Sequence, residues 1–299
     1  MFINGRCIPE KEINMQKDRE LWQSQNFLRR PNFVANLVET ADINSGDLVV
    51  EIGPGRGIIT QQLATKSDQV IAVEIDKNLA ANLQSSLRSF PNIQIIENNF
   101  LRWELPDEHY KVFSNIPFNM TADIVKKLTE DQNPPEVAYL IMQDKAMFRF
   151  MGKPRESQVS ILLKPWFKMR VITNINKNEF VPVPKVNVVL AELRKRKQPL
   201  VEEQFRQWYR DFVVYGYNQW QPTILDAFKD VFTSKQRHLL ANNLEIKKTK
   251  PSDLTITQWL KLFEVFMAHT TPEGKKVVEG SESRLRKQQK GLKKLHRTR

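Results

Sequence analysis

The stretch Val49–Gly57, VVEIGPGRG, is the part of the sequence that decides the fold. An apolar run typical of a buried strand leads into a loop with glycines at 53, 55 and 57, and a helical pattern follows. Glycines in such a loop permit positive φ and let a ligand approach the backbone without a Cβ in the way. The pattern predicts a ligand-binding strand–loop–helix unit, although a generic tight turn explains this stretch alone almost as well.

An acidic residue ends the next strand-like run, VIAVEI at 70–75. Glu74 lies 21 positions after Gly53, close to the ~20 at which a carboxylate meets the hydroxyl pair of a ribose. NAD is the competing ligand, but its fingerprint requires a glycine at the position that Ile58 occupies. A Gly-x-Gly-x-Gly loop followed by one acid therefore favours S-adenosylmethionine as the cofactor.

Helix-like and strand-like segments alternate outward from this loop, between residues 33 and 192. Such alternation predicts an α/β fold with a mostly parallel, Rossmann-like sheet, typical of class I S-adenosylmethionine-dependent methyltransferases, and a late antiparallel strand within 180–193. From Leu200 onward the pattern is helical only, which predicts a small C-terminal helical domain. Its aromatic stripe, Phe205, Trp208, Phe212 and Tyr215, has helical spacing and is interpreted as core.

Charge divides the chain further. The sequence holds 46 Lys+Arg against 34 Asp+Glu, a formal net charge of +12, and residues 275–299 alone carry ten basic and two acidic side chains. This end has few apolar residues and no sustained helical stripe, so it is expected to be mobile. The predicted organisation is an N-terminal extension (1–21), a catalytic domain (22–197), a helical RNA-binding domain (198–272) and a basic flexible tail (273–299).

Composition excludes several classes of protein. A 40% hydrophobic content argues against a disordered chain, and no apolar run reaches the ~18 residues of a membrane span. The N-terminus lacks a signal-peptide pattern, and a single cysteine fits a reducing cytoplasm. Four scattered histidines show no metal-ligand spacing. We therefore expect a cytoplasmic monomer that binds no metal ion and does not associate with a membrane. Its basic pI, near 9.7, indicates a polyanionic partner.

Asn115-Ile116-Pro117-Phe118 follows the fourth strand-like run, where open α/β sheets bind ligands. An adenine amino group is a poor nucleophile because its lone pair is delocalised into the ring. The Asn115 side-chain oxygen and the Ile116 carbonyl are suitable acceptors for its N–H groups. Pro117 fixes the backbone, and Phe118 offers a face for an extruded base. A proline turn with a buried phenylalanine explains these four residues alone equally well.

Two further segments give weaker signals. Asn99, after the third strand-like run, could bond the adenine amino group of the cofactor, although Asn-Asn is a common turn pair. The run SQNFL at 24–28 precedes the first helix without an obvious core role and could cover the cofactor.

Taken together, five segments resemble the erythromycin-resistance (Erm) rRNA adenine N6-methyltransferases and, more broadly, their relatives that dimethylate small-subunit rRNA. The segments are SQNFL (24–28), EIGPGRG (51–57), VEID (73–76), NIPFNMTADIVKKL (115–128) and FVPVPKVNVVL (180–190). The TADIVKK continuation is closer to the resistance enzymes. The resemblance implies contacts with S-adenosylmethionine for Asn26, Leu28, Gly53, Glu74, Asn99 and Asn115. It also implies that Asn115 and Ile116 hold the target amino group while Phe118 stacks on the base.

Two residues depart from the family pattern. Asn99 stands where Asp is usual, which keeps an acceptor but loses a charge, and Phe118 stands where Tyr is commoner. The resemblance implies mono- or dimethylation of one adenine in 23S rRNA and resistance to macrolide, lincosamide and streptogramin B antibiotics. The alternative is dimethylation of two adjacent adenines in 16S rRNA during small-subunit maturation. An RNA-binding protein with a decayed methyltransferase fold is a third reading, against which the intact glycine loop and NIPF argue.

Overall fold

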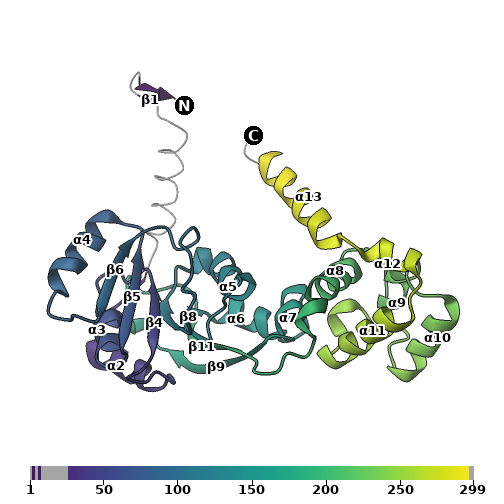
Figure 1. The fold of residues 1–299 in the computed structure, drawn as a ribbon, viewed down its shortest axis with the longest axis horizontal. Coiled ribbons are helices and arrows are strands. Elements are labelled where there is room, and N and C mark those ends of the chain that lie inside the picture. Colours follow the sequence, from purple (N-terminus) through teal and green to yellow (C-terminus); the bar gives the residue numbers. More distant parts are fainter. Residues whose placement is uncertain (1, 4–5, 8–25, 296–299) are drawn as a thin grey trace. The chain divides into compact units, whose positions relative to one another are not determined.

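The computed structural model describes residues 2–3, 6–7 and 26–295 (Figure 1). Apart from a short hairpin of β1 (Phe2–Ile3) and β2 (Arg6–Cys7), the expected N-terminal extension lies outside the described residues, as do Ser24, Gln25 and residues 296–299. The chain forms two compact units, residues 1–147 with 168–195 and residues 148–167 with 196–299.

A seven-stranded sheet with the order β6-β5-β4-β7-β8-β11-β9 forms the centre of the first unit. Its strands are β4 (Leu48–Ile52), β5 (Gln69–Glu74), β6 (Ile93–Glu97), β7 (Lys111–Asn115), β8 (Val137–Gln143), β9 (Phe167–Ile175) and β11 (Val188–Lys195). The first five pair in parallel, whereas β11 runs antiparallel to β8, with Val188 opposite Gln143. The predicted Rossmann-like sheet with a late antiparallel strand is confirmed.

Helices cover both faces of this sheet. They are α2 (Pro31–Glu39), α3 (Ile58–Ala64), α4 (Lys77–Ser86), α5 (Thr121–Glu130) and α6 (Asp144–Met151). All five residues of β4 are buried although successive side chains point to opposite faces, so neither face is open to water. Helix α4 begins at Asp76, whose carboxylate accepts hydrogen bonds from the N–H groups of Asn78 and Leu79 and so caps the helix.

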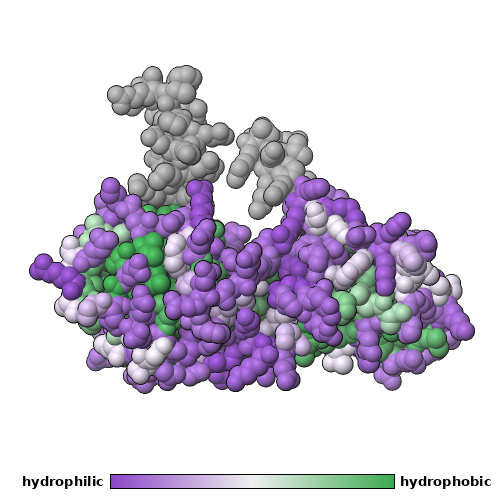
Figure 2. Space-filling view, in the orientation of Figure 1, coloured by the Kyte–Doolittle hydropathy of each residue, from purple (hydrophilic) through white to green (hydrophobic). Residues whose placement is uncertain are grey.

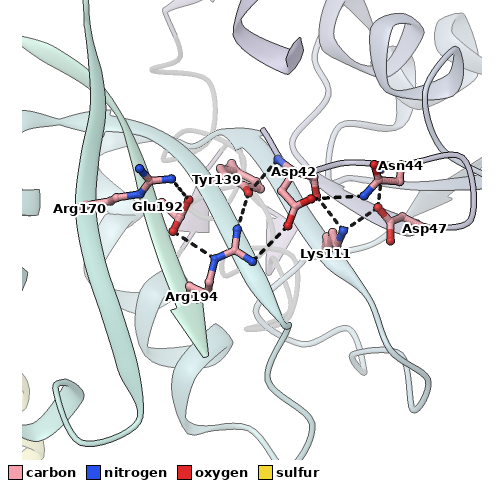
Figure 3. Close-up of polar contacts among 8 residues, drawn as sticks. All are labelled: Asp42, Asn44, Asp47, Lys111, Tyr139, Arg170, Glu192 and Arg194. Atoms are coloured by element: carbon pink, nitrogen blue, oxygen red, sulfur yellow. Dashed lines mark hydrogen bonds and ion pairs between the residues drawn. The ribbon is translucent and has the colours of Figure 1, made fainter. Parts of the chain in front are cut away.

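A polar network joins the amino ends of the parallel strands β7 and β8 to the carboxyl end of the antiparallel strand β11 (Figure 3). Its members are Asp42, Asn44, Asp47, Lys111, Tyr139, Arg170, Glu192 and Arg194. The Lys111 ammonium donates to the Asp47 carboxylate and to the Asp42 carbonyl, both at 2.7 Å. Arg194 donates to the Tyr139 hydroxyl at 2.8 Å and to the Asp42 carboxylate at 3.3 Å. The network therefore stabilises the end of the sheet at which the parallel strands begin. The opposite end, at which these strands finish, remains available to a ligand.

The second unit is helical. Its helices are α7 (Gln158–Leu163), α8 (Arg206–Tyr217), α9 (Ile224–Ala227), α10 (Ser234–Asn243), α11 (Ile256–His269), α12 (Pro272–Val278) and α13 (Ser281–Leu295). Phe212 of α8 is fully buried, with ring centroids of Phe228 and Phe266 at 4.5 and 4.9 Å. The core interpretation of the aromatic stripe is therefore confirmed for Phe212. Hydrophilic residues dominate the visible face of the unit (Figure 2).

Residues 148–167 belong to the helical unit, whereas the sequence places them in the catalytic domain. Helix α7 contacts α8 directly, because the Tyr209 hydroxyl donates to the Ile161 carbonyl at 3.1 Å. The Tyr209 ring also packs edge-on against Trp166 at 5.7 Å. These contacts join residues that lie far apart in sequence, so the sequence boundary misses them.

The C-terminal segment expected to be a flexible tail is helical over residues 273–295, which form most of α12 and all of α13. Arg210 of α8 holds the Glu282 carboxylate through two hydrogen bonds, Nε–Oε2 at 2.9 Å and Nη2–Oε1 at 2.6 Å. The Asp211 carboxylate accepts the backbone N–H groups of Gly280 and Glu282. Polar contacts rather than an apolar stripe anchor this segment, so hydrophobic periodicity does not reveal it.

Candidate active site

Four residues that the sequence predicts for the cofactor site lie at or just after the ends of four neighbouring strands. Asn99, Glu74, Gly53 and Asn115 end or follow β6, β5, β4 and β7, which lie in that order and run in parallel. The Gly53 N–H donates to the Val73 carbonyl at 2.9 Å. Because the carboxyl ends of parallel strands share one edge, the structure assembles all four residues along a single rim.

The glycine loop adopts a conformation that other residues rarely reach. Gly53, Gly55 and Gly57 have φ values of 62°, 59° and 78°. A Cβ at Gly57 would also lie 2.6 Å from Cδ2 of Leu83 in α4. The loop therefore needs glycine for its left-handed φ, and at Gly57 also for close packing on α4.

Glu74 connects the loop to the end of β5. Its Oε2 accepts the Gly55 N–H at 3.1 Å and its Oε1 accepts the Asp76 N–H at 2.9 Å. Burial raises the pKa of Glu74, and these backbone hydrogen bonds oppose the shift. A carboxylate accepts about four hydrogen bonds, so the side chain keeps capacity for a pair of hydroxyl groups.

The Asn115 amide is held in one orientation. Its Nδ2 donates to the Asn26 carbonyl at 2.7 Å. A carbonyl oxygen accepts and cannot donate, so the amide group that faces Asn26 must be the NH₂, which leaves Oδ1 as an acceptor on the other side. Asn26 immediately precedes β3 (Phe27–Leu28), which pairs with β10 (Phe180–Val181). Residues 26–28 and the FVPVP segment therefore support NIPF from outside the main sheet.

An ion pair closes this small β3–β10 sheet. Arg30 donates two hydrogen bonds to the Glu179 carboxylate, one of them from Nε at 2.6 Å, and the Arg29 N–H donates to the Glu179 carbonyl at 3.1 Å. Arg30 and Glu179 are 149 residues apart, and nothing in the sequence indicates that they are in contact.

The rest of NIPF forms a tight turn. The Pro117 carbonyl accepts the Met120 N–H at 3.0 Å, and the Phe118 carbonyl accepts the Thr121 hydroxyl at 3.0 Å. The Ile116 side chain is buried, and its N–H donates to the Ile141 carbonyl at 3.3 Å. Phe118 is half-buried and packs against the core. Part of its ring therefore stays accessible to a ligand.

Asn99 closes the turn after β6. Its Oδ1 accepts the Leu101 N–H at 3.0 Å, and the backbone N–H groups of Arg102 and Trp103 donate to its carbonyl. The side-chain oxygen thus shapes the loop at the end of β6.

A small pocket lies where the glycine loop meets β3 and β7. It brings together Leu28, Gly53 and Asn115 from the predicted set, whereas Asn26, Glu74 and Asn99 lie outside its lining. The sequence analysis did not single out its other lining residues, which are Phe27, Glu51, Pro54, Arg56, Ile58 and Ile59. The Arg56 guanidinium lies 5.4 Å from the Phe27 ring centroid, a cation–π contact across the pocket mouth.

Glu51 is the unusual member of this lining. It is 1% exposed, and its Oε2 has no hydrogen-bond partner within residues 26–295. Burial raises its pKa to about 8, and the charge of Glu74 adds to the shift. S-adenosylmethionine carries an ammonium and a sulfonium, so an unpaired buried carboxyl beside the glycine loop fits this cofactor. An acid inside the apolar run VVEI was the available sequence signal.

Replacing Glu51 with glutamine is expected to change how stability depends on pH. The folded state holds the Glu51 proton between pH 4.5 and about 8, whereas the unfolded chain releases it near 4.5. Stability from this group is therefore complete below pH 4.5 and falls by up to about 1.4 kcal/mol per pH unit as pH rises through that window. Urea unfolding of wild type and Glu51→Gln from pH 5 to 9 tests this, and parallel pH profiles would contradict it.

No helix within residues 2–3, 6–7 and 26–295 is long and apolar enough to cross a membrane. The same part of the chain holds no group of three or more His, Cys, Asp or Glu side chains placed to bind a metal ion.

Comparison with known proteins identifies the family. Residues 18–268 match the family model described as ribosomal RNA adenine dimethylase. The chain belongs to this family. The chain is therefore an S-adenosylmethionine-dependent rRNA adenine N6-methyltransferase with a Rossmann-like fold.

Relatives of two kinds are similar to the chain. The ribosomal RNA small subunit methyltransferase A of Alkaliphilus oremlandii is 27% identical over 79% of this chain and 87% of its own length. The rRNA adenine N-6-methyltransferase of Saccharopolyspora erythraea is 29% identical over 87% of this chain and 68% of its own length. Among solved structures, the 23S rRNA methyltransferase ErmE matches with a TM-score of 0.74 and 28% identity, over 81% of this chain and 100% of that one.

Proposed function

We propose that this rRNA adenine dimethylase family member methylates N6 of one adenine in 23S rRNA, once or twice, and confers resistance to macrolide, lincosamide and streptogramin B antibiotics. The observation that carries the chemistry is the Asn115 amide, which Asn26 orients so that Oδ1 is left as an acceptor beside the glycine loop. The likeness to ErmE over the whole of that chain supports the choice of 23S rRNA, as does the TADIVKK continuation of NIPF.

Positioning explains the catalysis. When bound, S-adenosylmethionine supplies an activated methyl group on its sulfonium. Asn115 Oδ1 and the Ile116 carbonyl would accept the two N–H groups of the target adenine and so orient its nitrogen toward that methyl group. Phe118 stacks on the base, and Pro117 fixes the turn that carries both acceptors. No base need act before the attack, because the amino proton becomes acidic only as the new bond forms.

Basic residues border the pocket on the segments that build it. Exposed Arg29, Arg30 and Arg56 lie on the β3 segment and the glycine loop, and half-buried Lys177 and exposed Lys185 flank β10. Such residues suit the phosphates of an RNA loop from which the target adenine is extruded. In the proposal the helical unit, which includes the predicted RNA-binding residues 198–272, provides further RNA contacts.

Dimethylation of two adjacent adenines in 16S rRNA is the second candidate. The observation in its favour is the similarity to small-subunit methyltransferases, including that of Shouchella clausii at 32% identity over 68% of this chain and 72% of its own length. The chemistry at Asn115 is the same for both substrates.

Purified transcripts separate the two candidates. We expect labelled methyl groups from S-adenosylmethionine to enter a 23S transcript and not a 16S transcript, and primer extension across rRNA from expressing cells to stop at one adenine. Label confined to 16S rRNA would overturn the resistance function while leaving the methyltransferase chemistry intact. Absence of cofactor binding by calorimetry would instead indicate an RNA-binding protein without activity.

Phe118→Ala is expected to lower methyl transfer far more than Phe118→Tyr. Loss of one stacking contact costs roughly 1–3 kcal/mol, whereas tyrosine keeps the ring face. Steady-state methylation of the rRNA transcript measures both variants, and unfolding curves for each provide the stability control. Equal activities of the two variants would rule out stacking as the role of Phe118.

A further inference from the structure

An exposed tryptophan stands at the end of α8 in the helical unit. The helix stops at Tyr217, and the Asn218 side chain donates to the Val214 carbonyl at 2.7 Å. Two residues later Trp220 has φ 53° and is 98% exposed. A bulky side chain rarely adopts a left-handed φ, and such a conformation costs energy. Packing does not offset this cost within the described residues, because both faces of the ring are in water.

Trp220 borders a pocket of about 710 Å³. Tyr217, Pro222 and Pro251 contribute apolar surface to its lining. The Tyr217 ring stacks on Trp259, with centroids 5.3 Å apart and planes 7° apart, and the Trp259 indole donates to the Pro251 carbonyl at 3.2 Å. These contacts fix the surface beside Trp220, so the pocket is preformed.

The charge around this pocket is positive. Lys250 is part of the lining, and the nearby Lys247 and Lys248 are also exposed. These lysines form no ion pair with the described residues of the chain, whereas the neighbouring acid Asp253 is engaged by Arg155 at 3.4 Å. An aromatic ring next to free cationic side chains is the combination by which proteins bind unpaired nucleotides.

We propose that Trp220 and Lys250 form an accessory site for an unpaired nucleotide of the RNA substrate. The base stacks on the Trp220 ring and enters the pocket over Tyr217, and Lys250 binds the adjacent phosphate. The site belongs to the helical unit, whereas the proposed methyl-transfer site at Asn115 belongs to the sheet unit. The inference rests on the proposed function. It adds to that function a second point of contact with single-stranded RNA.

Substitutions in the full-length protein test this site. We expect Trp220→Ala to weaken binding of oligoadenylate roughly tenfold, since one stacked base contributes about 1–3 kcal/mol, and Trp220→Phe to restore most of it. Binding of a blunt RNA duplex should be unchanged, because its bases are already stacked. Lys250→Gln should lower the salt slope of oligoadenylate binding by about 0.7, the value for one lost phosphate contact. The exposed Lys229, outside the pocket, supplies the matched control Lys229→Gln.

Methyl transfer provides a second readout. Trp220→Ala should raise the KM for the rRNA transcript and leave kcat unchanged at saturating RNA. Wild-type affinity of Trp220→Ala for oligoadenylate would overturn the accessory site, even if rRNA methylation proceeds normally. If wild type methylates no rRNA yet binds oligoadenylate through Trp220, the proposed function fails and the site stands. A change in the sedimentation of RNA-free protein on Trp220→Ala, with oligoadenylate binding intact, would show that a second copy covers the ring and would also overturn the proposal.

Discussion

Asn115→Ala is expected to lower kcat for methyl transfer by about 100-fold or more, the loss that follows removal of one preorganised hydrogen-bonding group. The substitution removes the acceptor that holds the target amine and also the amide that contacts the Asn26 carbonyl. The affinity for the rRNA transcript should change by less than about twofold, because phosphate contacts dominate RNA binding. Single-turnover methylation and RNA binding isotherms measure the two quantities separately.

Asn115→Asp distinguishes the two roles of the amide. Aspartate keeps an acceptor oxygen, but its second oxygen would face the Asn26 carbonyl in place of the present 2.7 Å donor contact. Two acceptors repel each other, so this variant should also lose most activity. Asn82→Ala, at an exposed position of α4, is the matched control. Normal turnover of Asn115→Ala would refute the assigned role, and normal turnover of Asn115→Asp would show that Asn26 does not orient the side chain.

Glu282→Ala is expected to cost about 3–5 kcal/mol of unfolding free energy, the range for breaking a buried ion pair from one side. The Arg210 and Glu282 side chains are nearly buried and joined by two hydrogen bonds, so the substitution leaves the Arg210 charge buried without its carboxylate. Chemical denaturation at neutral pH measures the loss. Glu279→Ala, at an exposed position before α13, should change stability by less than about 0.5 kcal/mol.

A double variant and a pH series test the cause. Arg210→Met combined with Glu282→Leu removes both charges and should recover most of the lost stability. Burial alone would raise the pKa of Glu282, but the hydrogen bonds and charge of Arg210, with the charge of Arg286, hold this pKa at about 2. The stabilisation is therefore complete above pH 4.5 and is lost as the pH falls toward 2. A double variant no more stable than Glu282→Ala would contradict a charge-based cause.

The parallel sheet could be predicted from the sequence because its signals are local. The apolar runs at Leu48–Ile52 and Val137–Gln143 coincide with β4 and β8, and Ile58–Ala64 coincides with α3. A buried strand needs an uninterrupted apolar run, and a glycine loop needs residues that tolerate positive φ. Residues that are adjacent in the sequence meet both requirements, so these elements can be predicted without knowledge of tertiary contacts.

Helices without a clear apolar stripe were harder to predict. Helix α10 has two buried residues, Leu240 and Ala241, and the sequence analysis did not predict it. Residues 223–232 have a helical pattern in the sequence, but the helix there, α9, covers only Ile224–Ala227. In α10 the capping box of Thr233 and Gln236 supplies hydrogen bonds that periodicity does not measure.

The sequence by itself determined the sheet, the glycine loop and the strand ends on which Asn99, Glu74, Gly53 and Asn115 stand, because strand direction and local φ follow from nearby residues. Only the tertiary structure decided which side chains meet. It paired Asn115 with Asn26 and Arg30 with Glu179, left Oε2 of the buried Glu51 without a hydrogen-bond partner among residues 26–295, and anchored the basic segment through Arg210 and Glu282. These contacts depend on directional hydrogen bonds between distant segments, and no local pattern encodes the geometry that such bonds require.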